Sequence, residues 1–189
     1  MSNPISQFIQ HYSRGFNIDN KSIDELSRHF HIVTHPKNYQ LFREQQKHDN
    51  AYYILQGAAR SYYLKDGVEV STWFAFEQDV VGSLYAYKDL PSRETVELLE
   101  DATLISINLR SLAPFAYSSL AISNFVRSII EEYAQFLEDR IFFMQFMSAA
   151  ERYELLLKHE PQALQRVPLT YISSYLGMSR ETLSRLRGK

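Results

Sequence analysis

The sequence predicts an α+β protein built in three successive parts. Short β-rich segments separated by turn residues indicate an antiparallel β-roll of the jelly-roll type within residues 1–117. A sustained apolar spacing of four and three residues then indicates one long helix over residues 118–147. Residues 148–189 end in two short helical patterns around a glycine. We take these three ranges as the predicted domains.

The first part combines helices with strands. Apolar residues recur at three- and four-residue steps within residues 4–30, which predicts amphipathic helices before the roll. After His31 the period shortens to that of strands, and turn formers such as Asp66-Gly67 separate the segments. Eight strands are predicted, at 32–34, 39–42, 51–55, 58–64, 68–74, 80–81, 95–98 and 103–107. Eight short strands at this spacing suggest an antiparallel barrel or jelly roll.

The long helix is expected to begin after Pro114 and to carry two apolar sets. The first set follows a coiled-coil period that only Arg140 interrupts: Ile122, Val126, Ile129, Tyr133, Phe136, Phe143 and Met147. The second set runs beside it: Phe125, Ile130, Leu137, Ile141, Phe142 and Phe146. One roll cannot easily cover both sets, so we predict a homodimer paired through this helix. The alternative is that the first set is the face by which the helix packs on its own roll.

The C-terminal part opens with a capping box. Ser148 and Glu151 have the spacing at which each side chain bonds the other residue's backbone N–H, so a new helix should begin there and run towards Pro161. Further on, Gly177 supplies the backbone freedom that a tight turn between two helices needs. Ser179 is a good N-cap for the helix that follows it.

The last predicted helix has two unlike faces. Arg180, Glu181 and Arg185 fall within an arc of roughly 140° at about 100° per residue. Arginine donates twice to guanine, and glutamate accepts from the amino group of cytosine. Leu183 and Leu186 occupy the other face and should pack on the preceding helix. We interpret this pattern as a DNA-binding helix-turn-helix; the alternative is an ordinary helical hairpin with solvated arginines.

The charge distribution favours the DNA-binding interpretation. The chain has 189 residues and a net charge of −2. From residue 166 onward there are five cations: Arg166, Arg180, Arg185, Arg187 and Lys189. Against one carboxylate they give this segment a net charge of +4, so the rest of the chain carries about −6. A basic end on an acidic body is expected if only that end meets phosphate.

The composition excludes several other classes of protein. There is no cysteine, which rules out disulfides, thiolate metal sites and thiol nucleophiles. The N-terminus lacks the pattern of a signal peptide, and no apolar run approaches the roughly 18 residues of a membrane span. No phosphate loop, nucleophile elbow or paired-carboxylate motif is present. We therefore expect a cytoplasmic, soluble protein that is not an enzyme and has no membrane partner.

The order of roll, long helix and helix-turn-helix resembles the Crp/Fnr type of bacterial transcription regulator over nearly the whole chain. Its most specific match is Gly177-Met-Ser-Arg-Glu-Thr-Leu-Ser-Arg185, which is similar to the recognition-helix pattern of that family. The resemblance implies a cyclic-nucleotide-binding-like sensor roll, a dimerisation helix, double-stranded DNA as partner and contact with RNA polymerase. Paired half-sites about 34 Å apart would follow for a two-fold dimer. The predicted DNA-binding residues are Ser179, Arg180, Glu181, Thr182, Arg185, Arg187 and Lys189.

The roll also resembles that family, but its ligand cassette departs from the pattern. Tyr52-Tyr-Ile-Leu-Gln-Gly57 looks like the strand-turn signature, and Asp79-Val-Val-Gly-Ser-Leu84 looks like the start of the cassette. In the family a glutamate that binds the ribose stands at the position of Ser83, and an arginine that pairs the cyclic phosphate stands at that of Ser92. The tentative ligand residues of this chain are Gly82, Ser83, Leu84, Arg93, Glu94 and Thr95.

These departures predict a degenerate pocket. Arg93 is displaced by one residue, and on a strand such a shift sends a side chain to the opposite face. Losing a charge-assisted contact to phosphate costs on the order of 1.5–3 kcal/mol, and Glu94 would repel the anion further. We expect cyclic AMP to bind poorly and name no cofactor, although Arg93 could serve another anion. An unknown small-molecule effector in each roll, or none, would set the spacing of the two recognition helices.

A second hypothesis is a small-molecule-sensing roll with a weak or vestigial DNA-binding end. Pro168 and Leu169 stand where the family often has a threonine cap and a basic residue, so one phosphate contact is missing. Loss of DNA retardation in an Arg180→Ala variant would distinguish the two hypotheses.

A cupin-like metalloenzyme is a distant third hypothesis. His29, His31 and His35 lie close together where the roll begins, and His48 follows. The cupin pattern needs a carboxylate a few residues onward and another histidine on a later strand, whereas the next acid is Glu44 and the later strands carry no histidine. We interpret these histidines as surface or strand residues and predict no metal.

Overall fold

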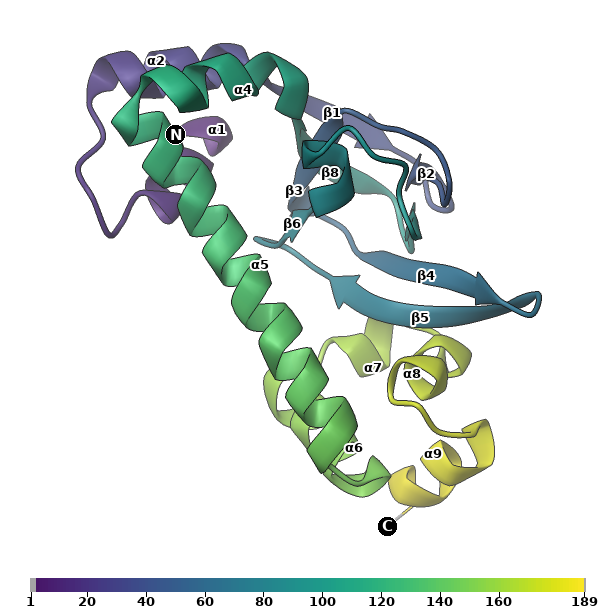
Figure 1. The fold of residues 1–189 in the computed structure, drawn as a ribbon. Helices are drawn as coiled ribbons and strands as arrows, with labels where there is room; N and C mark the ends of the chain where they lie inside the picture. Colours follow the sequence, from purple (N-terminus) through teal and green to yellow (C-terminus); the bar gives the residue numbers. More distant parts are fainter. Residues whose placement is uncertain (1–2, 189) are drawn as a thin grey trace.

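The computed structural model describes residues 3–188, and Figure 1 shows the roll beside one long helix with a group of short helices at its far end. Two helices precede the roll, α1 (Pro4–Tyr12) and α2 (Asn20–Arg28). Each has a side-chain cap, because Asn3 accepts from the backbone N–H of Ile5 and Asp19 from that of Ser22. Within the described residues, no helix is both long enough and apolar enough to cross a bilayer.

The roll consists of two four-stranded antiparallel sheets, with strand orders β1-β8-β3-β6 and β2-β7-β4-β5. The strands are β1 (Phe30–His35), β2 (Gln40–Phe42), β3 (Asn50–Gln56), β4 (Ala59–Lys65), β5 (Val68–Ala75), β6 (Val80–Val81), β7 (Thr95–Leu98) and β8 (Ala102–Asn108). All eight predicted strands are confirmed. Asp66 and Gly67 both have positive φ, 52° and 79°, as the two-residue turn of the β4–β5 hairpin requires.

Two apolar clusters hold the roll together. One lies between the sheets and includes the fully buried Ile54, Val96 and Leu104. The other joins the roll to its helices through Phe8 of α1 and Phe125 of the long helix, whose ring centroids lie 5.5 Å apart in an edge-to-face arrangement. The roll and the N-terminal half of the long helix therefore share one core.

Helix α3 (Leu84–Tyr87) lies between β6 and β7, and α4 (Leu109–Ser118) and α5 (Leu120–Phe146) separate the last strand from the C-terminal part. The predicted range of the long helix, 118–147, agrees with α5 to within two residues, but helix does not first return after Pro114, because Pro114 lies inside α4. The break falls at Ser119, whose extended backbone ends α4 and whose side chain accepts from the N–H of Ile122. A serine cap, rather than the proline, thus sets where α5 begins.

Four residues of the first apolar set of α5 pack on the chain's own core, as the alternative interpretation predicts, whereas Phe143 and Met147 belong to no described cluster. Ile122 is buried, Val126 and Ile129 pack on the cluster shared with α1, and Phe136 packs on the cluster between the sheets. Arg140, the charged interruption, donates to the backbone carbonyl of Tyr175 in the C-terminal part. The four- and three-residue spacing of this set thus follows from one helix that packs in turn on α1, on the sheets and on the C-terminal helices.

A second stripe of α5 remains uncovered in the single chain. It follows the same four- and three-residue steps and consists of Ile130, Ala134, Leu137, Ile141 and Met144. The side chains of Leu137, Ile141 and Met144 are 36%, 57% and 43% exposed. We call these five residues the α5 stripe. It includes Ile130, Leu137 and Ile141 of the predicted second set, whereas Phe125 of that set is buried.

The C-terminal part consists of α6 (Ala149–His159), α7 (Ala163–Arg166), α8 (Leu169–Tyr175) and α9 (Arg180–Arg187). The predicted capping box is confirmed, since Ser148 and Glu151 make both reciprocal bonds at the start of α6. Helix α7 was not expected. In Figure 1, α7 and α8 lie beneath the β4–β5 hairpin, and α9 lies at the outer end.

Candidate nucleic-acid interface and ligand cavity

The turn between α8 and α9 is fixed from two sides. Gly177 has φ +64°, and a Cβ there would lie 3.2 Å from the Met144 side chain of α5. Arg140 of α5 and Arg152 of α6 donate to the carbonyls of Tyr175 and Leu176 at the end of α8. Cations at these carbonyls also complement the negative end of a helix. The long helix therefore contacts the turn that sets the orientation of α9.

The inner face of α9 packs as predicted. Leu183 is buried in one cluster with Ile172 and Leu176 of α8 and the turn, and Leu186 packs against that cluster. Ser179 caps α9, because its hydroxyl accepts from the N–H of Thr182 at 3.2 Å. Both local predictions are confirmed, and they leave the polar face of α9 pointing outward.

The outer face of α9 presents charged groups to solvent. Arg180, Glu181, Arg185 and Arg187 are all exposed, as is Ser179. The backbone N–H of Glu181 at the helix start, aided by Ser179, lowers the pKa of the Glu181 carboxyl, which is therefore an acceptor at neutral pH. Arg185 makes a single bond of 3.3 Å to the Thr182 hydroxyl and retains other free donors. Lys189, also predicted to bind DNA, lies outside the described residues.

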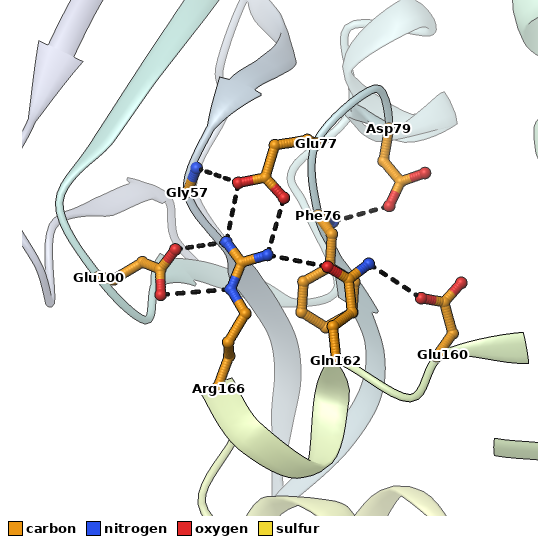
Figure 2. Close-up of polar contacts among 8 residues, drawn as sticks. All are labelled: Gly57, Phe76, Glu77, Asp79, Glu100, Glu160, Gln162 and Arg166. Carbon is orange, nitrogen blue, oxygen red and sulfur yellow. Dashed lines mark hydrogen bonds and ion pairs between the residues drawn. The ribbon is translucent and has the colours of Figure 1, made fainter. Parts of the chain in front are cut away.

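Arg166 does not belong to this surface, which corrects the charge argument made from the sequence. Its guanidinium donates to both oxygens of Glu77, to both oxygens of Glu100 and to the Gln162 amide oxygen (Figure 2). These five bonds use all five N–H donors of the group. Glu77 also accepts from the N–H of Gly57 at 2.8 Å, and the Arg166 bonds hold the pKa of Glu77 at about 2. Arg166 therefore joins α7 to two loops of the roll.

A second buried arginine joins the roll to α8. Arg60 of β4 is 2% exposed and donates to Glu97 and Glu69, each at 2.6 Å. Its guanidinium also lies over two rings, that of Tyr62 in the roll and that of Tyr171 in α8, at 4.3 and 3.5 Å. With Arg166, this contact fixes the C-terminal helices against the roll. We call the two arginines and their carboxylates the junction.

The interior of the roll holds the carboxylate of Glu94, one of the tentative ligand residues. Glu94 accepts from the hydroxyls of Ser61 and Thr72 and from the indole N–H of Trp73, and burial raises its pKa. Arg93 is exposed and lies over the Tyr85 ring at 4.7 Å. The structure thus separates Arg93 from Glu94, as the one-residue shift predicts. Ser92 is buried and bonds the backbone of Glu94 instead of presenting a cation.

The other tentative ligand residues have structural contacts. Gly82 lies against Ala51, since a Cβ would approach the Ala51 Cβ to 3.1 Å. Ser83 caps α3, whose first residue is Leu84, and the Thr95 hydroxyl accepts from the N–H of Glu44. Their assignment as ligand residues stays a prediction.

A cavity of about 260 Å³ lies between the roll and α5. Helix α4 and residues 82–84 close one side, and α5 closes another. Aromatic rings form much of its wall, and three carboxylate residues, Asp79, Glu132 and Glu160, also line it. Of its lining residues, the sequence singled out only Gly82, Ser83 and Leu84 as ligand residues, because the other walls come from distant segments that share no local motif.

The histidines at the start of the roll are engaged separately. His29 contacts Glu25 and Ser111, at 3.5 and 3.2 Å. The rings of His35 and His48 stack on Tyr39 and Phe42, with centroids 3.9 and 4.0 Å apart. Within residues 3–188, no three histidine or carboxylate side chains are grouped so that they could hold a metal ion.

Known proteins share this architecture. Residues 32–117 match the family model of the cyclic nucleotide-binding domain. The structure is similar to FixK2 from Bradyrhizobium japonicum, at 23% identity and a TM-score of 0.73, over 84% of this chain and 83% of that one. It is also similar to the c-di-GMP-responsive global regulator CLP from Xanthomonas campestris, at 19% identity and a TM-score of 0.69, over 90% of each chain.

A third similar structure is CooA from Carboxydothermus hydrogenoformans, at 18% identity and a TM-score of 0.64, over 85% of this chain and 76% of that one. None of the curated proteins matches the chain by sequence. At these identities the likeness establishes the fold, and with the domain match it confirms the resemblance stated from the sequence.

Proposed function

We propose that this chain, whose fold is that of the Crp/Fnr-type transcription regulators, is a homodimeric, sequence-specific DNA-binding regulator with a degenerate cyclic-nucleotide pocket. In this proposal α8 and α9 form the helix-turn-helix and α9 enters the major groove. Arg180, Glu181 and Arg185 would contact base edges, while Ser179 and Thr182 would contact phosphate.

The observation that carries this proposal is the state of the α9 surface. The arginines of its outer face are exposed, whereas the junction arginines are bonded to the chain's own carboxylates. The inner face is anchored by Leu183, and the turn is anchored by α5 and α6. A rigidly supported helix with free, forked cations suits recognition of guanine.

The α5 stripe supports the dimer. Its five residues have the heptad spacing by which two helices interdigitate, and they lie beside the face that packs on the roll. Pairing two stripes would remove the exposed side chains of Leu137, Ile141 and Met144 from water. Each chain would then present one α9, as a two-fold operator requires.

The roll interior supports the degenerate pocket. Glu94 has no cation among its bonded partners, and the donors that meet it are already bonded to a carboxylate. A cyclic phosphate entering that space would meet a buried carboxyl group and would lack the Arg93 guanidinium, which lies outside. We therefore expect weak binding of cyclic nucleotides.

Selection of bound fragments from random double-stranded DNA tests the DNA-binding function. A palindromic site with half-sites about 34 Å apart is expected. Arg180→Ala should weaken binding to that site by about 1–3 kcal/mol, because one bidentate base contact is lost. Lys158→Ala is the matched control, since Lys158 is an exposed cation of α6 that is not among the predicted DNA-binding residues. Selection of no sequence, or equal losses in both variants, would favour the sensing module with a vestigial DNA-binding end.

Light scattering tests the dimer. Ile141→Asp introduces a charge at a strongly exposed position of the α5 stripe and should convert a dimer to a monomer without loss of helicity. Gln135→Asp, an exposed position of α5 outside the stripe, should leave the mass unchanged. A wild-type monomer would contradict the pairing.

A further inference from the structure

The cavity between the roll and α5 has the size of a small-molecule site. Its volume of about 260 Å³ exceeds the roughly 150 Å³ of an engineered cavity that holds benzene, so a ring with a short chain fits. It adjoins the predicted ligand cassette, because Gly82, Ser83 and Leu84 line it, whereas Arg93 and Glu94 do not. Helix α5 forms one wall with Ile129, Tyr133 and Phe136.

The walls are aromatic and the charges are of one sign. Among the rings are those of Trp73, Phe76, Tyr87 and Tyr133. Three carboxylate residues line the cavity, and none of its described lining residues is lysine, arginine or histidine. Aromatic faces and carboxylates both attract cations, and both disfavour an anion.

Nearby cations do not neutralise these carboxylates. Arg166 is saturated by Glu77, Glu100 and Gln162, and Figure 2 shows the Asp79 carboxylate apart from it, bonded to the N–H of Phe76 at 2.7 Å. Arg140 lies over the Tyr175 ring at 4.0 Å and donates to a backbone carbonyl.

The hydrogen bonds to the other two carboxylates come from neutral donors. Glu132 accepts from the Tyr12 hydroxyl at 2.9 Å, and Glu160 accepts from the Gln162 amide. Burial, reinforced by Glu160, Glu132 and Glu77, raises the pKa of Asp79 to about 6, which shows the negative potential of this region.

We propose that this cavity binds a compact organic ammonium ion with an aromatic or otherwise apolar body. The ring would lie among Trp73, Phe76 and Tyr133, and the ammonium group would face Asp79 and Glu132. The role of this ligand as an effector rests on the proposed function. It would act through α5, because this helix lines the cavity and also carries the α5 stripe. Binding itself does not depend on DNA recognition.

Three probes of matched shape and different charge test the proposal on the full chain by calorimetry at pH 7.5. 2-Phenylethylamine is cationic, 2-phenylethanol is neutral and phenylacetate is anionic. We expect the amine to bind at least about tenfold more tightly than the alcohol, because charge-assisted bonds are roughly twice as strong as neutral ones. Phenylacetate should not bind.

Variants locate the binding site. Glu132→Gln and Asp79→Asn should each weaken amine binding severalfold, and together they should lower it to the level of the alcohol. Glu131→Gln is the matched control, because Glu131 is the next residue of α5, is paired with Arg127 and does not line the cavity. Circular dichroism confirms that each variant folds, and Glu132 is exposed enough for the glutamine to be tolerated.

Each other outcome contradicts the proposal. Equal affinity for amine and alcohol would show a purely apolar cavity, and preference for phenylacetate would reverse the charge argument. Binding of no probe would show that the cavity is closed or is covered by the second chain. Unchanged amine binding in the double variant would place the ligand elsewhere. None of these results bears on DNA retardation, so failure here leaves the proposed function standing.

Discussion

The junction and the outer face of α9 use arginine in opposite ways. At the junction, Arg60 and Arg166 are surrounded by carboxylates and rings of the same chain. On α9, Arg180 and Arg187 are exposed to solvent, and Arg180 interacts electrostatically with the neighbouring, exposed Glu181. The lesson is that the net charge of a segment overstates the cations available to a ligand. Without Arg166, residues 167–189 carry a net charge of +3.

The two surfaces depend on each other. The junction fixes α7 and α8 against the roll, and α9 is anchored on α8 through Leu183. The orientation of Arg180 and Arg187 on α9 therefore depends on Arg60 and Arg166 at the junction. Variants at the junction should therefore change stability, whereas variants on α9 should change DNA binding alone.

The largest expected effect is that of Arg60→Ala. It leaves Glu97 and Glu69 without their cation and opens space beneath Tyr171, which should lower the free energy of unfolding by about 3–5 kcal/mol. Urea denaturation measures the loss. Arg187→Ala, an exposed arginine of α9, is the control and should change stability by less than about 0.5 kcal/mol. Equal effects would remove the distinction between the two surfaces.

Arg166→Ala should have the next largest effect. It removes five charge-assisted hydrogen bonds, but Glu77 and Glu100 are partly exposed and regain water, so we expect a loss of about 2–3 kcal/mol. Arg166→Lys should recover less than half of it, because an ammonium group cannot bond two carboxylates bidentately. Full recovery by lysine would show that charge alone, without the forked geometry, holds the junction.

The smallest expected effect is the pH dependence of the free energy of unfolding, to which two neighbouring carboxyl groups contribute with opposite signs. Glu77 has a pKa of about 2, below its ordinary value of 4.5, so it stabilises the fold above pH 4.5 and this contribution is lost as the pH falls below that value. Asp79 has a pKa of about 6, above its ordinary value of 3.8, so the fold loses stability as the pH rises from about 4 to 6.

Asp79→Asn isolates the second contribution. It should stabilise the protein at pH 7 by on the order of 2 kcal/mol and have little effect at pH 4, where the carboxyl is protonated in the folded chain. The amide oxygen can still accept from the N–H of Phe76. Thermal unfolding midpoints at the two pH values measure the difference, and a destabilised variant at pH 7 would show that the charge of Asp79 is compensated.

Much of the fold could be predicted because its signals are local. The eight strands follow from a two-residue period between turn formers, and the starts of α6 and α9 follow from serine caps whose partners lie three residues away. Helix α4 was not predicted as a separate helix, because its helical signal adjoins that of α5 and Ser119 alone separates them.

The candidate surface was predicted better than the cavity. Arg180, Glu181 and Arg185 share a face by helical geometry alone, and nothing elsewhere in the described chain covers them. Only the cassette segment that begins at Asp79 was predicted from the sequence, because Trp73 and Tyr133 join it only when α5 crosses the roll.

The sequence by itself determined where the strands and the longer amphipathic helices lie, and which residues α9 displays, since each depends on neighbours within about four positions. Only the tertiary structure decided which face of α5 is covered, that Arg166 is neutralised, and that Glu94 lies inside the roll. Arg166 meets Glu100 and Glu77 across 66 and 89 residues of chain. No periodicity encodes such a meeting, because it depends on how the completed roll and helices pack.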